Sequence, residues 1–309
     1  MSALSHIVVD WGTSSLRLWA LDHDGRVLAE RRSGEGLEVA GKQGFEAVLE
    51  AHLTALDVPN GVPVMMCGMV GSRAGWVEAP YLHAPVRLDD LVARATVVPA
   101  RNRQVRILPG IAQVSTDTPD VLRGEETQLL TLALARHTGL ACLPGTHSKW
   151  VQLVDGTVEG FATFMTGELF QLLRTASVIR PAVEGADAVD PESASFRAGV
   201  AAALDDPAQM THLLFELRAG WLLTGAAPDA TLARLSGLLI GIELAGATRR
   251  YGSLDGVVLV AATSAAPLYR RALAIAGVTG LIERDAEACV REGLHAAALS
   301  AFLQQGSMS

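Results

Sequence analysis

The sequence predicts a protein of the α/β class that is built from two related half-domains. The chain has 309 residues, and 50% of them are hydrophobic. That is enough for two cores at the rough prior of ~150 residues per domain. Strand-type and helix-type apolar runs both occur, and one strand-loop-strand pattern occurs twice. We place the first half-domain at residues 1–114 and the second at 115–309, and expect a terminal helix at 285–303 to pack on the first.

The first copy of the pattern is VVDWGTSSLRLWALDHDGRVLAER, from Val8 to Arg31. An apolar strand ends at Asp10, a polar loop follows, and an Asp24-Gly25 turn joins two further strands. The first loop consists of Gly12, Thr13, Ser14 and Ser15. Its glycine lets backbone approach a ligand, its amides and hydroxyls can donate to phosphate oxygens, and Asp10 can hold Mg²⁺. Taken alone, the stretch is also typical of an ordinary polar turn.

The second copy is CLPGTHSKWVQLVDGTVEGFATF, from Cys142 to Phe164. The second loop consists of Gly145, Thr146, His147 and Ser148. It aligns with the first loop without a gap, and an Asp-Gly turn again follows. An internal repeat of this kind indicates duplicated half-domains, whose loops would grip one polyphosphate from opposite sides. Chance similarity of two hairpins is the alternative. We assign His147 no role beyond its place in the loop.

The paired loops resemble the phosphate motifs of the sugar kinase, Hsp70 and actin superfamily. With MCGMVGSRAGWVEAPYL, PDVLRGEETQLL and TFMTGELFQLL, the chain more narrowly resembles the 2-dehydro-3-deoxygalactonokinases, from His6 to about Leu294. This resemblance implies a two-lobed actin-like, ribonuclease H-like ATPase fold. Each lobe would carry a mixed β-sheet flanked by helices, with the ligand cleft between the lobes. It also implies phosphorylation of 2-dehydro-3-deoxy-D-galactonate at its terminal hydroxyl in galactonate breakdown, giving the 6-phosphate, with ATP and Mg²⁺ as cofactors.

A glycine-rich loop after the apolar run at residues 64–67 is the expected sugar-acid site. The planar guanidinium of an arginine can bind the carboxylate of a sugar acid through two hydrogen bonds, and the indole of a tryptophan can pack on the carbon chain of the sugar acid. A surface ion pair for Arg73 and ordinary packing for Trp76 are the alternatives, and the family resemblance favours substrate binding. The candidate substrate-binding residues are Gly71, Arg73, Trp76 and Glu126.

The candidate base lies in Gly124-Glu125-Glu126, at or just before a helix start, where the helix dipole favours carboxylates in any case. Related glycerol and pentulose kinases place Gly-Asp-x-Gln here, with the Asp as base. By that resemblance either Glu125 or Glu126 can approach the substrate, and we favour Glu125 as the catalytic base. Asp10 is the second catalytic residue and the metal ligand. Ala261-Ala262 replaces expected adenosine-motif glycines, which leaves the adenine contacts open.

Composition and the absence of certain motifs disfavour several other classes of protein. The net charge of -8 disfavours nucleic acid and acidic membranes, and three cysteines without metal-type spacing fit reduced cytosolic thiols. No Walker motif occurs, the first strand begins too early for a signal peptide, and the apolar run at 235–247 is short for a membrane span. We expect a cytoplasmic enzyme with a small-molecule sugar-acid substrate, and a homo-oligomer stays open. The alternatives are a kinase for another sugar acid and a non-catalytic sugar-acid sensor.

Overall fold

The computed structural model describes residues 3–303, and the chain divides into two compact units. Within that range, unit 1 holds residues 3–138, 153–160 and 286–303, and unit 2 holds 139–152 and 161–285. The predicted boundary between two lobes, 1–114 and 115–309, differs from the boundary between these compact units. The lobes were predicted as the two parts that close over a ligand, and this division stays a prediction. Contacts group residues 115–138 with unit 1, because α4 (Glu126–Leu134) packs on α10 (Ala286–Ala298).

Unit 1 is built on a six-stranded mixed sheet with the order β3-β2-β1-β4-β8-β7. Its strands are β1 (Leu4–Trp11), β2 (Leu16–Asp22), β3 (Val27–Ser33), β4 (Val64–Gly68), β7 (Thr96–Val98) and β8 (Val105–Ile107). β1 pairs antiparallel with β2 and parallel with β4. The first three strands confirm the predicted meander, and Gly25 in the turn between β2 and β3 has a φ of 80°. A side chain rarely adopts that backbone angle, which explains the glycine there.

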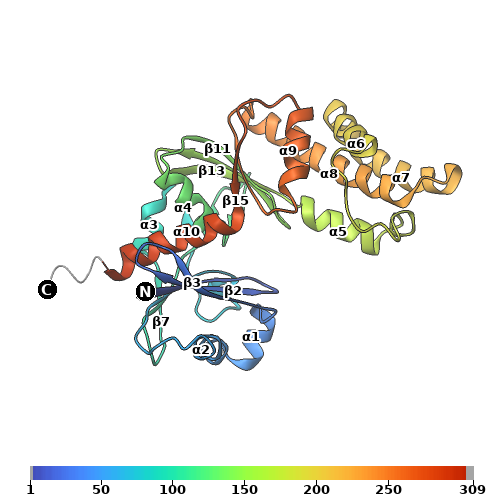
Figure 1. Cartoon of the computed structure of the whole chain (residues 1–309). Coiled ribbons are helices and arrows are strands. Elements are labelled where there is room, and N and C mark those ends of the chain that lie inside the picture. Colours follow the sequence, from blue (N-terminus) through green and yellow to red (C-terminus); the bar gives the residue numbers. More distant parts are fainter. Residues whose placement is uncertain (1–2, 304–309) are drawn as a thin grey trace. The chain divides into compact units, whose positions relative to one another are not determined.

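Helices cover both faces of this sheet (Figure 1). On one face, α1 (Leu37–Gln43) and α2 (Phe45–Thr54) contribute to the core that β1 and β2 form. On the other, α10 contacts β1 and β4. Unit 1 also contains α3 (Leu88–Ala93) and a small sheet of β5 (Leu82–His83), β9 (Ile111–Gln113) and β10 (Asp120–Leu122).

The second sheet repeats the order of the first. It runs β15-β14-β11-β12-β13-β6. Its strands are β6 (Val86–Arg87), β11 (Gly139–Leu143), β12 (Ser148–Val154), β13 (Thr157–Phe164), β14 (Val258–Ala261) and β15 (Ile282–Asp285). The run β13-β12-β11-β14-β15 therefore corresponds to β3-β2-β1-β4-β8, as the predicted duplication requires. Asp155 and Gly156 both have positive φ, 47° and 75°, which fits the tight turn between β12 and β13.

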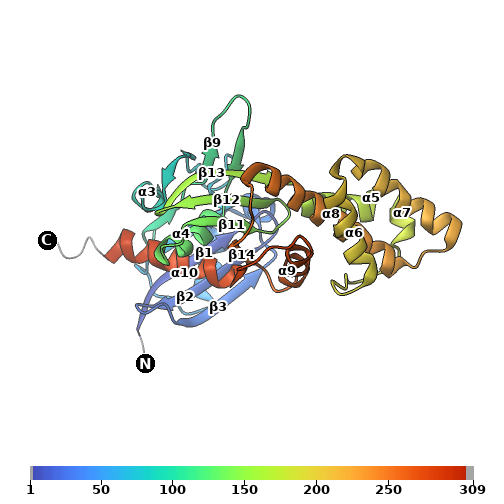
Figure 2. The ribbon, with the colours of Figure 1, turned by 90° about the horizontal axis from the view of Figure 1, so that it is seen from above.

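Unit 2 adds a cluster of helices to its strands. These are α5 (Thr166–Ala176), α6 (Ala194–Asp205), α7 (Met210–Thr224), α8 (Pro228–Tyr251) and α9 (Ala266–Ile275). α8 is long and apolar enough to cross a membrane by composition alone, but 72% of its most apolar window is buried inside the protein, as in a core helix. α6 and α8 lie side by side (Figure 2). Their close approach needs glycine, because a Cβ on Gly237 would lie 2.3 Å from the carbonyl oxygen of Phe196.

Gly293 plays the same part where α10 packs on α4, and its replacement should be costly. A Cβ at this position would lie 1.9 Å from the carbonyl oxygen of Thr127, so one helix must move. We expect Gly293→Ala to lower the free energy of unfolding by about 2 kcal/mol or more, measured by urea denaturation. The matched control is Gly41→Ala on α1, where nothing lies within 4 Å and alanine should be neutral or stabilising. Equal stability of the two variants would contradict this packing.

Candidate active site

Asp10 lies at the carboxyl end of β1, between Arg17 on β2 and Cys67 on β4. Its Oδ2 accepts a hydrogen bond from Arg17 Nη2, and its Oδ1 lies 3.8 Å from Cys67 Sγ. Arg17 also reaches Glu287 on α10, with 3.3 Å between Nη1 and Oε2. Within residues 3–303, no group of three or more His, Cys, Asp or Glu could hold a metal ion. One carboxylate is nevertheless enough for Mg²⁺ when phosphates and waters supply the other oxygens.

The first loop forms a tight turn directly after β1. The amide of Gly12 donates to the carbonyl oxygen of Ser15 at 2.8 Å, and the side chains of residues 13–15 are exposed. Gly36 packs directly against the backbone of the first loop. Only glycine fits there, because a Cβ on Gly36 would lie 2.3 Å from the carbonyl oxygen of Thr13. The sequence analysis did not single out Gly36, although Ser33-Gly34-Glu35-Gly36 was a visible signal of irregular backbone.

The loop at residues 124–126 lies against the end of β4, near Asp10. Gly124 has a φ of 108°, and a Cβ on it would lie 3.7 Å from the Cα of Gly68. A Cβ on Gly68 would in turn lie 3.3 Å from Asp10 Oδ1. Unit 1 therefore brings the predicted metal ligand and the predicted base region together at the carboxyl ends of β1 and β4.

The two glutamates of this loop have different surroundings. Glu126 is fully buried, and its Oε2 accepts a hydrogen bond from the Gly124 amide at 2.5 Å. Its Oε1 has no hydrogen-bond partner in the part of the chain that the structure describes. Burial, with a smaller effect of the Glu125 charge, raises the pKa of Glu126 to about 8. Glu125 is partly exposed, and its Oε2 accepts from the Arg123 amide at 3.1 Å. At neutral pH Glu126 thus holds a proton and is a poor base, while Glu125 is accessible.

The raised pKa of Glu126 predicts a pH-dependent effect of Glu126→Gln. The folded protein keeps this proton up to a pH of about 8, whereas the unfolded carboxyl ionises near 4.5. Wild-type stability therefore falls as the pH rises through this window, because the folded state binds more protons. Glutamine resembles the protonated form, so the variant should gain on wild type by up to about 1.4 kcal/mol per pH unit. Urea unfolding of both proteins at pH 6 and pH 9 measures this gain, and parallel pH profiles would contradict it.

The predicted sugar-acid residues are spread over surface and core. The Arg73 side chain is 92% exposed, with 3.8 Å between its Nε and Glu78 Oε1. Trp76 is half-buried, and its ring stacks on Phe45 with centroids 6.4 Å apart. Gly71 is buried, and a Cβ there would lie 2.7 Å from a methyl carbon of Ile107. Of these three, Arg73 presents a charged group to solvent, and Glu78 is its ion-pair partner.

Arg123 is a functional candidate that the sequence reasoning missed. Its Nη2 donates to the carbonyl oxygen of Ala79 at 2.9 Å, and its guanidinium lies 4.2 Å from the ring centroid of Tyr81. Its Nη1 is buried and has no hydrogen-bond partner among residues 3–303. A Cβ on Gly71 would lie 3.0 Å from this nitrogen. An arginine directly before Gly124 was the available signal.

The second loop lies in unit 2, against the start of α5. Gly145, Thr146 and His147 are exposed. The amide of Glu168 donates to the carbonyl oxygen of Thr146 at 2.9 Å, and a Cβ on Gly167 would lie 2.4 Å from the carbonyl oxygen of Gly145. The carbonyl oxygens of Gly145 and Thr146 therefore meet the N-terminus of α5, which fixes the loop to this helix.

Ser148 differs from the other three residues of the second loop because it is fully buried. Its hydroxyl lies 2.8 Å from the hydroxyl of Tyr269 on α9. The side chain of Ser148 therefore faces the interior of unit 2. If Ser148 binds phosphate, it must do so through its backbone amide.

A pocket of about 200 Å³ adjoins the second loop within unit 2. Its walls include Gly145, Thr166, Phe170, Ile240, Leu268 and Tyr269. The walls come from the loop and from α5, α8 and α9, and most of the lining surface is apolar. The pocket also reaches Ala265, just past the segment at 261–264 where an adenosine motif was expected. The size and lining suit a flat heterocycle.

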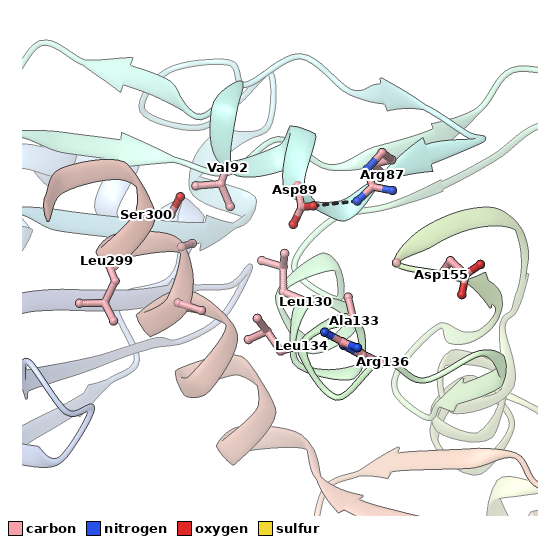
Figure 3. Close-up of a pocket in the computed structure, with 13 residues that line it drawn as sticks. Arg87, Asp89, Val92, Leu130, Ala133, Leu134, Arg136, Asp155, Leu299 and Ser300 are labelled. Atoms are coloured by element: carbon pink, nitrogen blue, oxygen red, sulfur yellow. Dashed lines mark hydrogen bonds and ion pairs between the residues drawn. The ribbon is translucent and has the colours of Figure 1, made fainter. Parts of the chain in front are cut away.

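A second pocket, of about 640 Å³, lies in unit 1 (Figure 3). Leu130 and Leu134 of α4 and Leu299 beyond α10 form its apolar part, and Arg87 and Asp89 form an ion pair at its edge with 3.0 Å between Nη2 and Oδ2. None of the predicted site residues is among those that line it.

Comparisons with known proteins identify the family. The family described as 2-keto-3-deoxy-galactonokinase matches residues 10–297. A probable 2-dehydro-3-deoxygalactonokinase of Rhizobium meliloti (strain 1021) is 50% identical over 295 residues, which cover 95% of this chain and 96% of the relative. The 2-dehydro-3-deoxygalactonokinase of Escherichia coli (strain K12) is 35% identical over 296 residues, 95% of this chain and 98% of the relative.

Solved structures agree with the sequence relatives. A crystal structure of a protein from Sinorhizobium meliloti, assigned as a 2-dehydro-3-deoxygalactonokinase, is 48% identical with a TM-score of 0.93 and covers 96% of this chain and 99% of that one. An activator of 2-hydroxyisocaproyl-CoA dehydratase from Clostridium difficile, with bound ADPNP, is 11% identical with a TM-score of 0.50 and shares the fold over 99% of this chain and 98% of its own. The predicted actin-like class is confirmed, and the chain belongs to the 2-keto-3-deoxy-galactonokinase family.

Proposed function

We propose that the protein transfers the γ-phosphoryl group of ATP to the terminal hydroxyl of 2-dehydro-3-deoxy-D-galactonate and forms the 6-phosphate in the cytoplasm. The observation that carries this proposal is the 50% identity to a curated kinase of that name over 95% of the chain. The geometry at the ends of β1 and β4, where the loop that carries Glu125 lies near the candidate metal ligand Asp10, supports it.

The two loops are the proposed phosphate-binding elements. The first loop offers exposed hydroxyls after Gly12, and the second offers exposed backbone at Gly145 and Thr146 beside the start of α5. Mg²⁺ held at Asp10 would offset charge on the β- and γ-phosphate oxygens. Phosphoryl transfer depends mainly on such positioning and charge neutralisation, since its transition state needs little covalent help.

The 200 Å³ pocket beside the second loop is the proposed site of the adenine ring. Its apolar walls suit a heterocycle, and Gly145 belongs both to the pocket and to the loop that would hold the phosphates. One ATP molecule can therefore place its base in the pocket and its phosphates at the loop. The adenine ring would be contacted mainly by side chains of α5, α8 and α9. These side chains would do the work of the adenosine-motif glycines, which are absent here because the chain has Ala261-Ala262 in their place.

Glu125 is the proposed general base. It would accept the proton of the substrate's terminal hydroxyl as that oxygen bonds to the γ-phosphorus and the bond to ADP breaks. Glu126 is not suited to this step because it is buried and its raised pKa leaves it protonated at pH 7. We propose that Glu126 acts indirectly: its carboxyl accepts a hydrogen bond from the Gly124 amide and so stabilises the conformation of the loop.

Arg73 is the proposed partner of the substrate carboxylate, near Gly71 and Trp76, with Arg123 as a second cation. We expect Arg73→Ala to raise the KM for the sugar acid about 10- to 100-fold, the typical loss for a hydrogen bond to a charged group. The KM for ATP should not change. Steady-state kinetics measures both constants, and Arg94→Ala, another exposed arginine of unit 1, is the control. A KM for the sugar acid that stays at the wild-type value would remove Arg73 from the site.

Release of ADP in the presence of a panel of sugar acids tests the function as a whole. We expect turnover with ATP, Mg²⁺ and 2-dehydro-3-deoxy-D-galactonate, and a lower kcat/KM with its epimers. Equal efficiency on several epimers would overturn the galactonate assignment and keep the kinase. Saturable sugar-acid binding without ADP release would instead support a sensor.

A further inference from the structure

Glu243 is a buried carboxylate on α8 that no step of the proposed reaction uses. Its side chain is only 1% exposed. Its Oε1 accepts a hydrogen bond from Trp150 Nε1 on β12 at 2.9 Å, and its Oε2 accepts from the Tyr269 hydroxyl on α9 at 2.7 Å. Oε2 also accepts a hydrogen bond from Thr166 Oγ1 at the start of α5. One side chain thus joins α8 to three other elements of unit 2.

These hydrogen bonds continue into the second loop through Tyr269. Ser148 Oγ lies 2.8 Å from the Tyr269 hydroxyl. Tyrosine has a single hydroxyl hydrogen, and Tyr269 donates it to Glu243, so Ser148 must donate to Tyr269. The line of donors therefore runs from Ser148 to Tyr269 to Glu243. Because Ser148 is the last residue of the second loop, this line fixes one end of that loop to α8.

The same partners form walls of the 200 Å³ pocket. Thr166 and Tyr269 both line it. Thr166 is the first residue of α5, and its hydroxyl donates to Glu243. The next residue, Gly167, packs against the carbonyl oxygen of Gly145. The hydrogen bonds of Glu243 therefore hold two residues that line the pocket, and through these residues they contact both ends of the second loop.

Both carboxylate oxygens of Glu243 have hydrogen-bond partners although the side chain is buried. Burial raises the pKa of this carboxyl, while the hydrogen bonds from Thr166, Tyr269, Trp150 and Ser148 act in the opposite direction. None of the polar atoms in this network is without a partner among the described residues. A fully satisfied buried network of this kind holds its members in one arrangement.

We propose that Glu243 is a positioning residue that holds the second loop and two walls of the pocket in the geometry that binds ATP. This inference rests on the proposed function, because that proposal assigns the loop and the pocket to ATP. Glu243 is not among the residues that line the pocket, and the proposed reaction assigns it no contact with the reacting atoms. Its loss should therefore weaken ATP binding more than it slows the chemical step.

A matched pair of tyrosine variants tests this role. Tyr269→Phe removes the hydroxyl that makes hydrogen bonds with both Ser148 and Glu243. Tyr251→Phe removes a hydroxyl that donates to the carbonyl oxygen of Trp150 at 2.9 Å, a bond to the same strand that does not involve Glu243. We expect Tyr269→Phe to raise the KM for ATP about tenfold, with a smaller change in kcat and none in the KM for the sugar acid. Tyr251→Phe should leave all three constants at wild-type values.

Glu243→Gln provides the second, larger change, because glutamine turns one acceptor into a donor that faces other donors. We expect its KM for ATP to rise about 10- to 100-fold. Thermal unfolding shows whether this variant folds, and Tyr269→Phe keeps the test available if it does not. Wild-type values in the folded variants, or equal increases in the two tyrosine variants, would overturn the positioning role.

Calorimetric titration with a non-hydrolysable ATP analogue separates this inference from the proposed function. If the wild-type protein does not bind the analogue, the proposed function fails. If wild type binds it and the folded Tyr269→Phe and Glu243→Gln variants bind it equally well, the positioning role alone fails. We expect wild type to bind the analogue and both variants to bind it more weakly.

Discussion

Replacement of Glu125 by glutamine should lower kcat by about 10²- to 10⁴-fold, the usual contribution of a positioned general base. The amide has nearly the same shape but accepts no proton, so the substrate hydroxyl must react without that help. ATP binding should persist, because Glu125 belongs neither to the two proposed phosphate loops nor to the proposed adenine pocket. Single-turnover kinetics and analogue titration measure the two effects separately.

The comparison with Glu126→Gln decides between the neighbouring carboxyls. Because Glu126 is buried and protonated at neutral pH, its amide variant resembles the wild-type state and should retain much more activity than Glu125→Gln. The reverse order, with both variants folded, would move the role of base to Glu126.

Replacement of Asp10 by asparagine should produce the second large loss. We expect kcat to fall by about 10²-fold or more, since an anionic metal ligand beside the developing charge is lost. The Mg²⁺ concentration for half-maximal activity should rise about tenfold or more. The fold should tolerate the change, because Arg17 keeps its contact with Glu287.

Magnesium titrations of the reaction rate test this prediction. Asp24→Asn is the control, since its side chain is 71% exposed in the turn after β2. An Asp10→Asn enzyme with the magnesium dependence of wild type would show that the metal is held elsewhere.

The strands and loops could be predicted from the sequence because their determinants are local. Apolar runs, a glycine-bearing loop and an Asp-Gly turn define β1 to β3, and the same signals define β11 to β13. The start of α4 at Glu126 also agrees with the prediction, since the apolar spacing begins there. Duplication of the pattern then indicated the shared strand order of the two sheets.

The burial of single polar side chains could not be predicted, because it depends on which elements pack together. Glu126 was expected to contact substrate, yet its carboxyl is fully buried, so its proposed role is now indirect. Ser148 aligns with Ser15, but only Ser15 is exposed, because Tyr269 from a distant helix meets Ser148. Glu243 is the one charged residue in the apolar run at 235–247, and only the tertiary structure supplies its partners.

The pocket of unit 2 was also invisible in the sequence. Its walls come from three helices and a loop that are far apart in the chain. No local motif marks such a site, whereas the glycines expected near 261–264 would have done so. Arg123 stood in a quoted motif, but its unpartnered nitrogen beside Gly71 depends on the fold of the loop at residues 69–79.

A crystal structure of the protein with Mg²⁺ and a non-hydrolysable ATP analogue tests the central claim most directly. The account predicts one nucleotide whose phosphate oxygens accept hydrogen bonds of about 3 Å from the amides of both loops. The metal should lie beside Asp10 and the base in the pocket lined by Phe170 and Tyr269. A nucleotide bound with its phosphates away from Gly12 or from Gly145 would contradict the account.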